Sequence, residues 1–599
     1  MDVPVSAIPS SEGSFDDASA STRPTTPSSS PLFEKTPTLD ELLAQCSLSR
    51  KTAITRICVI GAGYVGGPTA AVLALHNPHI TVDVVDRDPR RIQKWQSPHL
   101  PVHEPGLDRV VRVARDGALV TLDADADVDV DVDAVSEGPQ RTPNLHFTCD
   151  AAGSIARADM VFLAVNTPTK TFGVGAGRAT DMTAVDEAVR EIGQHAQAGA
   201  IIVEKSTVPC GTAQRIRQTL ATLRPNTPFE VLSNPEFLSE GSAIANLTAP
   251  DRVLIGSADT PAGRQAAQRL ADLYAAWVPR GRIVAVNAWS SELGKLVANA
   301  MLAQRISSIN AVSAICEQTG AAVDEVARAV GMDARLGPQF LRAGVGFGGS
   351  CFRKDIASLT YLAESLGLPD VAAYWDQVLA MNDAQRRRFA RRVVDRFDGN
   401  LRGRKLAVLG FAFKKDTGDT RESPAAEVIR ALLEERPAEI AVFDPYCAEE
   451  DVYRELQGAP RVRVLADPYL ACSRAHAVLV LTDCEQFRNA PVGGGGGAGR
   501  RESDGDSLFA ASRAEVWTSA SNGMGYRLAP QEACPEDCST CRTTASRPTA
   551  TEPLEWARVA YNLQEPKCVF DGRGFLDAAE MERLGVQLVT VGRRSVEGR

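Results

Sequence analysis

The chain has 599 residues, a length typical of several domains, and its 44% of apolar residues are enough to build full-sized cores. Its net charge of -10 argues against general binding of nucleic acid, although a local positive site could still hold a phosphate. No apolar run reaches the roughly 18 residues of a membrane helix, and the first residues resemble neither a secretory signal nor a mitochondrial transit peptide. We therefore expect a soluble cytoplasmic protein whose 13 cysteines are mostly reduced.

The first segment, residues 1–50, is rich in Ser, Thr, Pro and Asp and has no apolar periodicity. Such a composition cannot bury enough apolar surface to offset the entropy of the chain. We therefore expect a disordered tail, with the ordered chain starting at residue 51.

A dinucleotide-binding motif follows the tail. Residues 56–60 predict a strand, the glycines after it open a helix, and a second strand ends at Asp86. Gly61 permits a tight turn, Gly63 lets the backbone approach a pyrophosphate, and Gly66 lets the helix pack on the strand. Asp86 is placed to bond the adenosine ribose, which favours NAD over NADP, although Arg87 beside it leaves that preference open. The predicted cofactor contacts of this motif are Gly61, Gly63, Tyr64, Val65, Gly66 and Asp86.

Two further strands are predicted at 160–165 and 200–208, each ending in polar residues. Ligands of a doubly wound sheet bind beyond the carboxyl ends of its strands, so we expect Thr167 and Thr207 to line the cofactor crevice. Before these strands, aspartates alternate with Ala or Val from residue 123 to residue 133. Like charges stacked on one face would destabilise a strand. A calcium-binding loop would need a glycine and a glutamate, which this run lacks. The pattern favours a solvated surface insertion over about 123–150.

The segment from Ser290 to Gly320 contains no proline and predicts one long helix of about 28 residues, capped by serines at its start. We expect this helix to join two α/β halves and to form an oligomer contact. Lys295 and Asn299 are spaced i,i+4, so they share one face and could meet one ligand. A solvated Lys–Asn pair is the alternative interpretation.

A second α/β unit is predicted from about residue 401, with strands at 405–413, 439–445, 476–482 and 567–573. Its first loop carries two lysines and Arg421 at a strand's carboxyl end, which suits a phosphate or diphosphate. Ser423 and Pro424 then predict a helix start, as N-cap and first helical residue.

An insertion interrupts this second unit over about 491–552. It contains three possible zinc ligands, where a structural zinc site needs four. We therefore expect a disordered insertion and no metal site. The three cysteines considered as ligands are Cys534, Cys538 and Cys541.

Several long motifs occur in an order that resembles one protein family. CVIGAGYVGGPTAAV, EKSTVP, LSNPEFLSEG, GFGGSCFRKD and GFAFKKDTGDTRES are similar to motifs of the UDP-glucose/GDP-mannose dehydrogenase family, especially its animal-type UDP-glucose dehydrogenases. The resemblance implies two Rossmann-like nucleotide-binding domains joined by a long central helix. It also implies NAD-dependent, four-electron oxidation of UDP-glucose to UDP-glucuronate.

The resemblance and the composition together divide the chain into four parts. They are a tail at 1–50, an NAD-binding domain at 51–285, a central helical and dimerisation region at 286–400, and a UDP-sugar-binding domain at 401–599. We expect a homo-oligomer, either a dimer of the central helices or a hexamer.

The resemblance makes Cys351 the nucleophile that holds the sugar carbon as a thiohemiacetal and then a thioester. Only a thiolate is nucleophilic enough near neutral pH without a dedicated base. Arg353, Lys354 and a helix N-terminus would lower its pKa, and the glycines before it would let the backbone approach the sugar. A buried structural cysteine is the alternative.

The remaining roles also come from the resemblance. Lys295 and Asn299 would stabilise the oxyanion at the sugar carbon. Asp355 would act through a water that Thr207 positions. Glu236 would assist thioester hydrolysis, and Glu240, spaced i,i+4 from it if the segment is helical, would contact the nicotinamide side. The full set expected to bind substrate is Glu236, Lys295, Asn299, Arg335, Phe340, Phe347, Gly348, Lys415 and Arg573. Glu240 and Arg421 are expected to contact the cofactor as well.

Within this set, Phe340 and Phe347 would flank the substrate, and Lys415 and Arg573 would grip the sugar nucleotide. Arg335 would come from a neighbouring subunit, so that the site is complete only in an oligomer. Two alternatives stay open at this point. One is the same chemistry on GDP-mannose or a UDP-N-acetylhexosamine, and the other is a non-catalytic regulator that binds NAD or a UDP-sugar.

Overall fold

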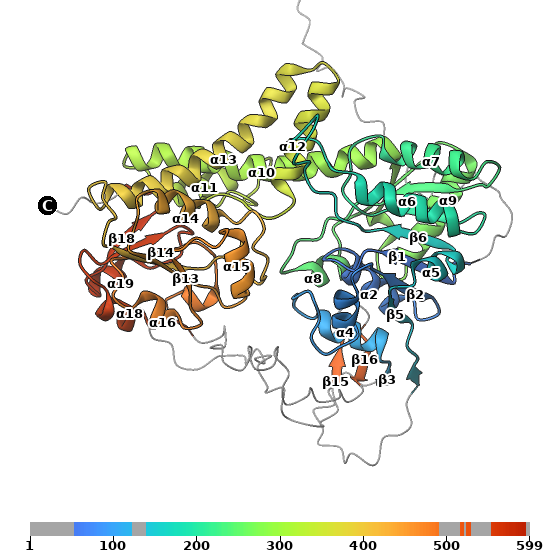
Figure 1. Ribbon diagram of the computed structural model, residues 1–599, viewed down its shortest axis with the longest axis horizontal. Helices are drawn as coiled ribbons and strands as arrows, with labels where there is room; N and C mark the ends of the chain where they lie inside the picture. The colour runs from blue at the N-terminus through green and yellow to red at the C-terminus, as the bar shows by residue number, and fades with distance from the viewer. Residues whose placement is uncertain (1–52, 122–138, 490–515, 520–522, 529–552, 595–599) are drawn as a thin grey trace, which may run out of the picture.

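The computed structural model describes residues 53–121, 139–489, 516–519, 523–528 and 553–594. Two sheets of mostly parallel strands form the two halves of the molecule, and long helices run between them (Figure 1). This is the α/β architecture expected from the sequence. Among the described helices, none is long and apolar enough to cross a membrane.

The first sheet has eight strands whose central members are buried along their whole length. Such continuous apolar runs suit a sheet that is covered by helices on both faces. Only the contact between β8 and β9 is antiparallel. The strand order is β10 (Ile283–Asn287), β9 (Val253–Ser257), β8 (Glu230–Ser233), β7 (Ile201–Glu204), β6 (Met160–Leu163), β1 (Arg56–Ile60), β2 (Thr81–Val85) and β5 (Leu145–Thr148).

Helices on both faces of this sheet connect its strands. They are α2 (Gly66–His76), α3 (Pro89–Trp95), α4 (Leu107–Arg115), α5 (Ala151–Arg157), α6 (Thr183–His195), α7 (Thr212–Leu223), α8 (Ala243–Thr248) and α9 (Pro261–Tyr274). The strand order reverses beside β1, which has β2 on one side and β6 on the other. A crevice for ligands is expected at that reversal, beyond the carboxyl ends of the strands.

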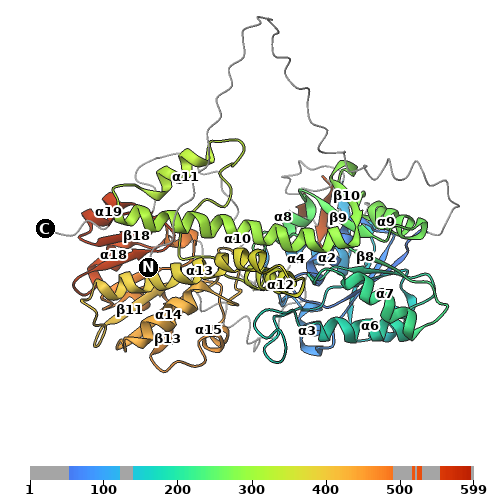
Figure 2. The ribbon, with the colours of Figure 1, turned by 90° about the horizontal axis from the view of Figure 1, so that it is seen from above.

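The central region consists of α10 (Ala288–Gln318), α11 (Val323–Gly331), α12 (Phe352–Ser365) and α13 (Pro369–Asp395). Figure 2 shows α10 running from the first half to the second, with α13 alongside. The expected long helix is therefore present, but its predicted serine cap was wrong. The Asn287 side chain caps the helix by accepting a hydrogen bond from the Ser290 backbone at 2.8 Å. Asn is as good an N-cap as Ser, and it places the serines inside the first turn.

The second sheet has six parallel strands in the order β13 (Val462–Val464), β12 (Glu439–Phe443), β11 (Lys405–Leu409), β14 (Ala477–Val480), β17 (Cys568–Asp571) and β18 (Gln587–Thr590). Its helices are α14 (Pro424–Glu434), α15 (Glu449–Glu455), α16 (Pro468–Cys472), α18 (Trp556–Asn562) and α19 (Ala578–Arg583). The start of α14 is as predicted, because the Ser423 side chain accepts a hydrogen bond from Ala425 and Pro424 takes the first helical position.

The structure differs from the two expected insertions. β5 lies within 123–150, yet it pairs with β2 in the main sheet, because its alternate residues Leu145 and Phe147 fill the core. The second segment, 491–552, contains the strands β15 (Val516–Thr518) and β16 (Gly525–Leu528). The aspartate run, the three cysteines and the N-terminal tail lie outside the described residues.

The two insertions meet in a small antiparallel sheet on the first half. Its order is β15, β16, β3 (Ala118–Thr121) and β4 (Gln140–Arg141). Figure 1 shows the orange strands β15 and β16 beside β3, below α4. The side chains of Tyr526 and Leu528 are only 2% and 1% exposed and join the core of the first half. A segment inserted in the second half of the sequence therefore completes the first half of the structure.

We expect Tyr526→Ala to lower the free energy of unfolding by about 3 kcal/mol, because it leaves a cavity where a large buried ring was. Urea unfolding followed by tryptophan fluorescence measures this loss. Tyr561 is 86% exposed, so Tyr561→Ala is the matched control and should change stability by no more than a few tenths of a kcal/mol. Equal stability of the two variants would show that β16 is not part of this core.

Candidate active site

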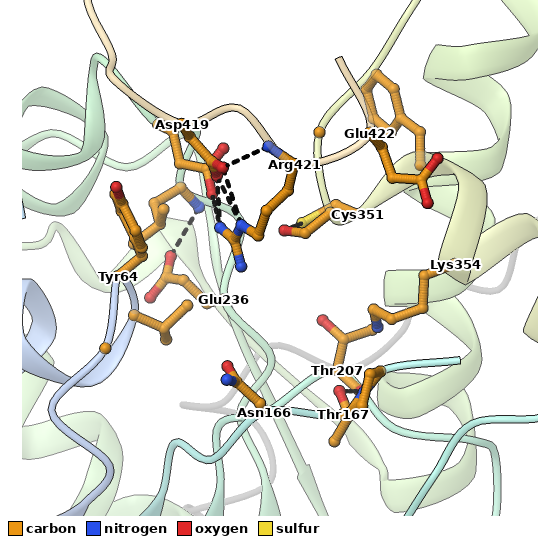
Figure 3. A pocket seen from close by; sticks show the side chains of 18 of the residues that line it. Tyr64, Asn166, Thr167, Thr207, Glu236, Cys351, Lys354, Asp419, Arg421 and Glu422 are labelled. Atoms are coloured by element: carbon orange, nitrogen blue, oxygen red, sulfur yellow. Dashed lines mark hydrogen bonds and ion pairs between the residues drawn. The ribbon is translucent and has the colours of Figure 1, made fainter. Parts of the chain in front are cut away.

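A cavity of about 2240 Å³ lies between the two halves and the central helices. Figure 3 shows side chains from all three regions pointing into it. Four predicted site residues do not line it: Gly66 and Asp355 lie behind its wall, and Arg335 and Lys415 lie elsewhere. The predicted residues that line it are Gly61, Gly63, Tyr64, Val65, Asp86, Thr167, Thr207, Glu236, Glu240, Lys295, Asn299, Phe340, Phe347, Gly348, Cys351, Arg421 and Arg573.

The glycine turn between β1 and α2 fits a dinucleotide. Gly61 has a φ of +105°, and a Cβ there would lie 2.4 Å from the Ala164 carbonyl oxygen. A Cβ on Gly66 would lie 1.8 Å from the Gly61 carbonyl oxygen, so that position also requires glycine. By contrast, a Cβ on Gly63 would meet no atom within 4 Å, which leaves the backbone open to a pyrophosphate.

Asp86 lies at the carboxyl end of β2 and lines the same cavity. Burial opposes its charge, but backbone N–H groups of Asp88 and Ala62 and the Arg91 guanidinium hold the pKa of Asp86 below its ordinary value. The carboxylate therefore stays ionised and can accept a hydrogen bond from a ribose hydroxyl. Arg87, whose side chain is 84% exposed, pairs with Glu187 instead.

A chain of polar contacts links α10 to α12. The Asn299 side-chain amide donates to Asp355 Oδ2 at 2.6 Å, and Lys295 Nζ lies 3.5 Å from Asn299 Oδ1. Asp355 is fully buried, and its other oxygen pairs with Lys354 Nζ at 2.7 Å. Burial lowers the pKa of Lys295, while the negative charges of Asp355 and Cys351 oppose that shift. The charge of Lys295 is thus disfavoured by burial and supported by its anionic neighbours.

Cys351 is the N-cap residue of α12, and its sulfur opens onto the cavity. Its expected low pKa was wrong: burial among protein atoms raises the pKa of Cys351, as do the charges of Asp355 and Glu240. Lys295 and Lys354 oppose that rise. Arg353 does not contribute, because its guanidinium pairs with Asp383 and Glu422. The thiol therefore needs a neighbouring base, or a change in its surroundings, to become a nucleophile.

The two glutamates after β8 are not on a helix, so the i,i+4 relation that a helix would give them does not apply. They lie in a loop that begins with Asn234-Pro235, where proline disfavours a helix at the residue before it. Glu236 Oε2 pairs with Lys205 Nζ at 2.9 Å. Glu240 reaches the other half and pairs with Arg421 at 3.1 Å. Burial and the charge of Asp419 raise the pKa of Glu240 to about 8.

Thr167 and Thr207 lie together, as expected, because the Thr167 hydroxyl donates to the Thr207 carbonyl oxygen at 2.7 Å. The Arg421 guanidinium lies 5.2 Å from the ring centre of Tyr64, so it faces the glycine turn from the opposite half. Among the residues expected around the sugar, Phe347 is 6% exposed and Phe340 has a φ of +62°. Both phenylalanines line the cavity.

Gly348 lines the cavity and also packs closely against the protein. A Cβ there would lie 2.4 Å from the Glu422 carbonyl oxygen and 2.6 Å from Pro424 Cδ. Arg573 fits an anionic ligand better: its Nε donates to the Leu481 carbonyl oxygen, while Nη2 has no hydrogen-bond partner among the described residues. Burial lowers the pKa of Arg573 to about 10. A bound phosphate would satisfy this guanidinium.

Two predicted substrate residues lie away from the cavity. Lys415 is half exposed, close to Asp416 and Glu485, and its neighbour Lys414 lines the cavity instead. Adjacent loop residues point in different directions, and sequence alone cannot show which lysine turns inward. Arg335 is 90% exposed on its side chain and pairs with Asp333. Within the part of the chain that the structure describes, no group of three or more His, Cys, Asp or Glu residues could hold a metal ion.

A buried carboxyl pair supports the loop that carries Thr207 and was missed from the sequence. Glu292 on α10 accepts backbone hydrogen bonds from Gly211 at 2.5 Å and Ala213 at 2.7 Å, at the start of α7. Glu204 at the end of β7 is 1% exposed and packs against Glu292. Burial and the charge of Glu292 raise the pKa of Glu204 well above its ordinary value. The fold therefore favours the protonated form of Glu204.

Replacing Glu204 with Gln should change how stability depends on pH. Below about pH 4.3 Glu204 is protonated in both the folded and the unfolded states, so its contribution to stability is complete. At higher pH only the unfolded state loses the proton, and the wild type should lose up to about 1.4 kcal/mol per pH unit relative to Glu204→Gln. Denaturant unfolding of both proteins from about pH 5 to 7 measures the difference, and parallel stability profiles would contradict it.

Comparison with known proteins agrees with this geometry. The UDP-glucose/GDP-mannose dehydrogenase family matches the chain with its NAD binding domain at 55–136 and 129–278, its central domain at 289–384 and its UDP binding domain at 407–495. UDP-glucose 6-dehydrogenase of Mus musculus is 48% identical over 553 residues, which are 90% of this chain and 94% of that protein. UDP-glucose 6-dehydrogenase 5 of Oryza sativa subsp. japonica is 41% identical over 558 residues, 90% of this chain and 97% of that protein.

A solved structure extends the likeness to three dimensions. The UDP-glucose dehydrogenase of the archaeon Pyrobaculum islandicum is 31% identical, with a TM-score of 0.60 over 73% of this chain and 91% of that chain. The glycine turn, the cavity between two nucleotide-binding halves and these matches lead to the same conclusion: the chain belongs to the UDP-glucose/GDP-mannose dehydrogenase family.

Proposed function

We propose that the chain is an NAD-dependent UDP-glucose 6-dehydrogenase, which oxidises the primary alcohol of UDP-glucose to the carboxylate of UDP-glucuronate. One observation carries the proposal: Cys351 and Lys295 share a single cavity with a glycine turn fitted to a dinucleotide and with the partly unpaired Arg573. The two relatives compared above are UDP-glucose 6-dehydrogenases, which favours UDP-glucose over other nucleotide sugars.

The chemistry consists of two oxidations and one hydrolysis. The alcohol first loses a hydride and a proton to give an aldehyde, and the Cys351 thiol adds to its carbon to form a thiohemiacetal. Loss of a second hydride and a proton gives a thioester, and water then releases the carboxylic acid and the thiol. NAD, when bound, accepts the hydride in each oxidation, so two molecules are reduced for every sugar. The covalent bond to sulfur keeps the aldehyde from escaping between the steps.

The roles of the surrounding residues follow from their charges and contacts. We propose that Lys295 stabilises the oxyanion at the sugar carbon, an effect worth about 3 kcal/mol in a preorganised site. Asn299 orients this lysine through its amide and ties it to Asp355. Thr207 and Glu236 line the cavity and orient water for the hydrolysis.

We also propose that the protein is a cytoplasmic homo-oligomer and that its folded domains divide near residues 285 and 400. Apolar side chains on one side of α10 are exposed: Trp289 and Met301 by 53%, Leu293 by 38% and Ile315 by 63%. A second copy packed through this helix would cover them. Arg335, which is remote from its own cavity, would then be free to enter the cavity of the neighbouring copy.

Replacement of the nucleophile tests the proposed function. Cys351→Ala should form no NADH from UDP-glucose, because neither the thiohemiacetal nor the thioester can form, yet it should bind UDP-glucose in a calorimetric titration. Cys149 is another exposed cysteine that lines the cavity, so Cys149→Ala is the control and should keep its activity. Full NADH formation by Cys351→Ala would overturn the mechanism.

A further inference from the structure

A second buried lysine lies beside the cavity and has no role in the chemistry described so far. Lys205 follows β7, and its side chain is only 4% exposed. Its ammonium group contacts Glu236 Oε2 at 2.9 Å, the Tyr274 hydroxyl at 3.1 Å and Asn234 Oδ1 at 3.2 Å. The Tyr274 hydroxyl donates in turn to Asn234 Oδ1 at 2.7 Å. The ammonium group therefore makes two hydrogen bonds and one ion pair with buried protein groups.

This lysine controls the charge of Glu236. Burial alone would favour the neutral acid, but Lys205 and the backbone N–H groups of Phe237 and Leu238 hold the pKa of Glu236 below its ordinary value. Burial likewise opposes the charge of Lys205, while Glu236 and Tyr274 hold its pKa above the ordinary value. Each member of the pair therefore depends on the other to stay ionised.

The contacts also fix the direction of the carboxylate. Glu236 Oε1 accepts two backbone hydrogen bonds, from Phe237 at 2.7 Å and Leu238 at 2.9 Å, while Oε2 faces Lys205. Phe237, the next residue, has its ring 4.9 Å from Lys295 Nζ, which places the pair beside the proposed oxyanion site. Figure 3 shows Glu236 and Cys351 around the same pocket.

The two lysines differ in the way their charge is held. Burial lowers the pKa of Lys295, and no ion pair of the described residues holds its charge. Lys205 is locked in an ion pair and keeps its charge. A lysine that stays charged beside a catalytic carboxylate is suited to keeping that carboxylate an anion.

We propose that Lys205 is a positioning residue that keeps Glu236 a fixed anion, oriented to accept a hydrogen bond from the water that attacks the thioester on Cys351. In that step the water oxygen bonds to the thioester carbon, the carbon–sulfur bond breaks, and sulfur leaves with the electron pair. The water proton leaves through the hydrogen bond to Glu236. The inference rests on the proposed function, since it assigns a residue to the last step of that reaction.

The experiment compares the wild type with Lys205→Met in a rapid-quench assay with NAD and UDP-glucose, across about pH 6 to 9. Both hydride transfers precede hydrolysis, so the variant should give the same first burst of NADH as the wild type. Its steady-state turnover should then fall by at least about tenfold at the acidic end and recover as the pH rises. Intact-mass spectrometry should find the sugar nucleotide attached to Cys351 in the variant at acidic pH.

Further variants separate the effect of the Lys205 charge from the effect of its packing. Lys205→Arg keeps the positive charge and should hydrolyse the thioester at nearly the wild-type rate. In a double-mutant cycle, Lys205→Met should add no further loss to Glu236→Gln, because the lysine acts only through that carboxylate. If Lys205→Met does not fold, Lys205→Gln takes its place. That variant keeps a hydrogen-bond donor but loses the charge, so the expected result is the same.

The outcomes distinguish this inference from the proposed function. A wild type that gives no burst and no turnover with UDP-glucose would overturn the proposed function itself. The inference alone would be overturned if the wild type behaves normally but the Lys205 variant forms no adduct on Cys351 and loses no turnover at acidic pH. A variant that loses the burst together with turnover would make Lys205 a structural residue, and would overturn the inference as well.

Discussion

The attachment of both halves to one helix is the constraint on which the cavity depends. α10 has 31 residues, and at 1.5 Å per residue it is about 46 Å long, enough to reach both sheets. Its first turns pack against β8 and β9 and carry Lys295 into the cavity. Near its other end, Glu317 accepts a hydrogen bond from the Gly592 backbone and pairs with Arg392 on α13. A shift of either half would therefore move that half relative to Lys295, the proposed oxyanion site.

Ion pairs between and within the two halves influence which residues of the cavity carry charge. Arg421 of the second half pairs with Asp419 of its own loop and also with Glu240 of the first half, so this ion pair links the two halves. Within the first half, the neighbours Glu204 and Lys205 lie beside different glutamates. The environment of Glu204 disfavours its charge, whereas that of Lys205 favours its charge. Glu204 lies beside a second acid, and its pKa is raised, whereas Lys205 lies beside Glu236 and each member of that pair favours the charge of the other. Contacts made far apart in the sequence thus decide which groups carry charge.

Local patterns could be predicted from the sequence, and contacts across the fold could not. The glycine turn after β1 and the shared face of Lys295 and Asn299 follow from short-range spacing, and the structure has both. The pKa of Cys351 depends on burial and on Glu240, which reaches it from a distant loop. The choice between Lys414 and Lys415 depends on how one loop turns. Nothing in the local pattern of 491–552 indicates that its strand β16 pairs with β3, because that partner lies more than 400 residues earlier.

The amount of NADH formed per molecule of UDP-glucose tests the central claim, which is that one cavity holds the sugar on Cys351 between two oxidations. With limiting UDP-glucose and excess NAD, NADH can be followed by its absorbance and the products identified by chromatography. The account predicts two NADH per sugar, with UDP-glucuronate as the product and no free aldehyde. One NADH per sugar with release of the aldehyde would contradict it.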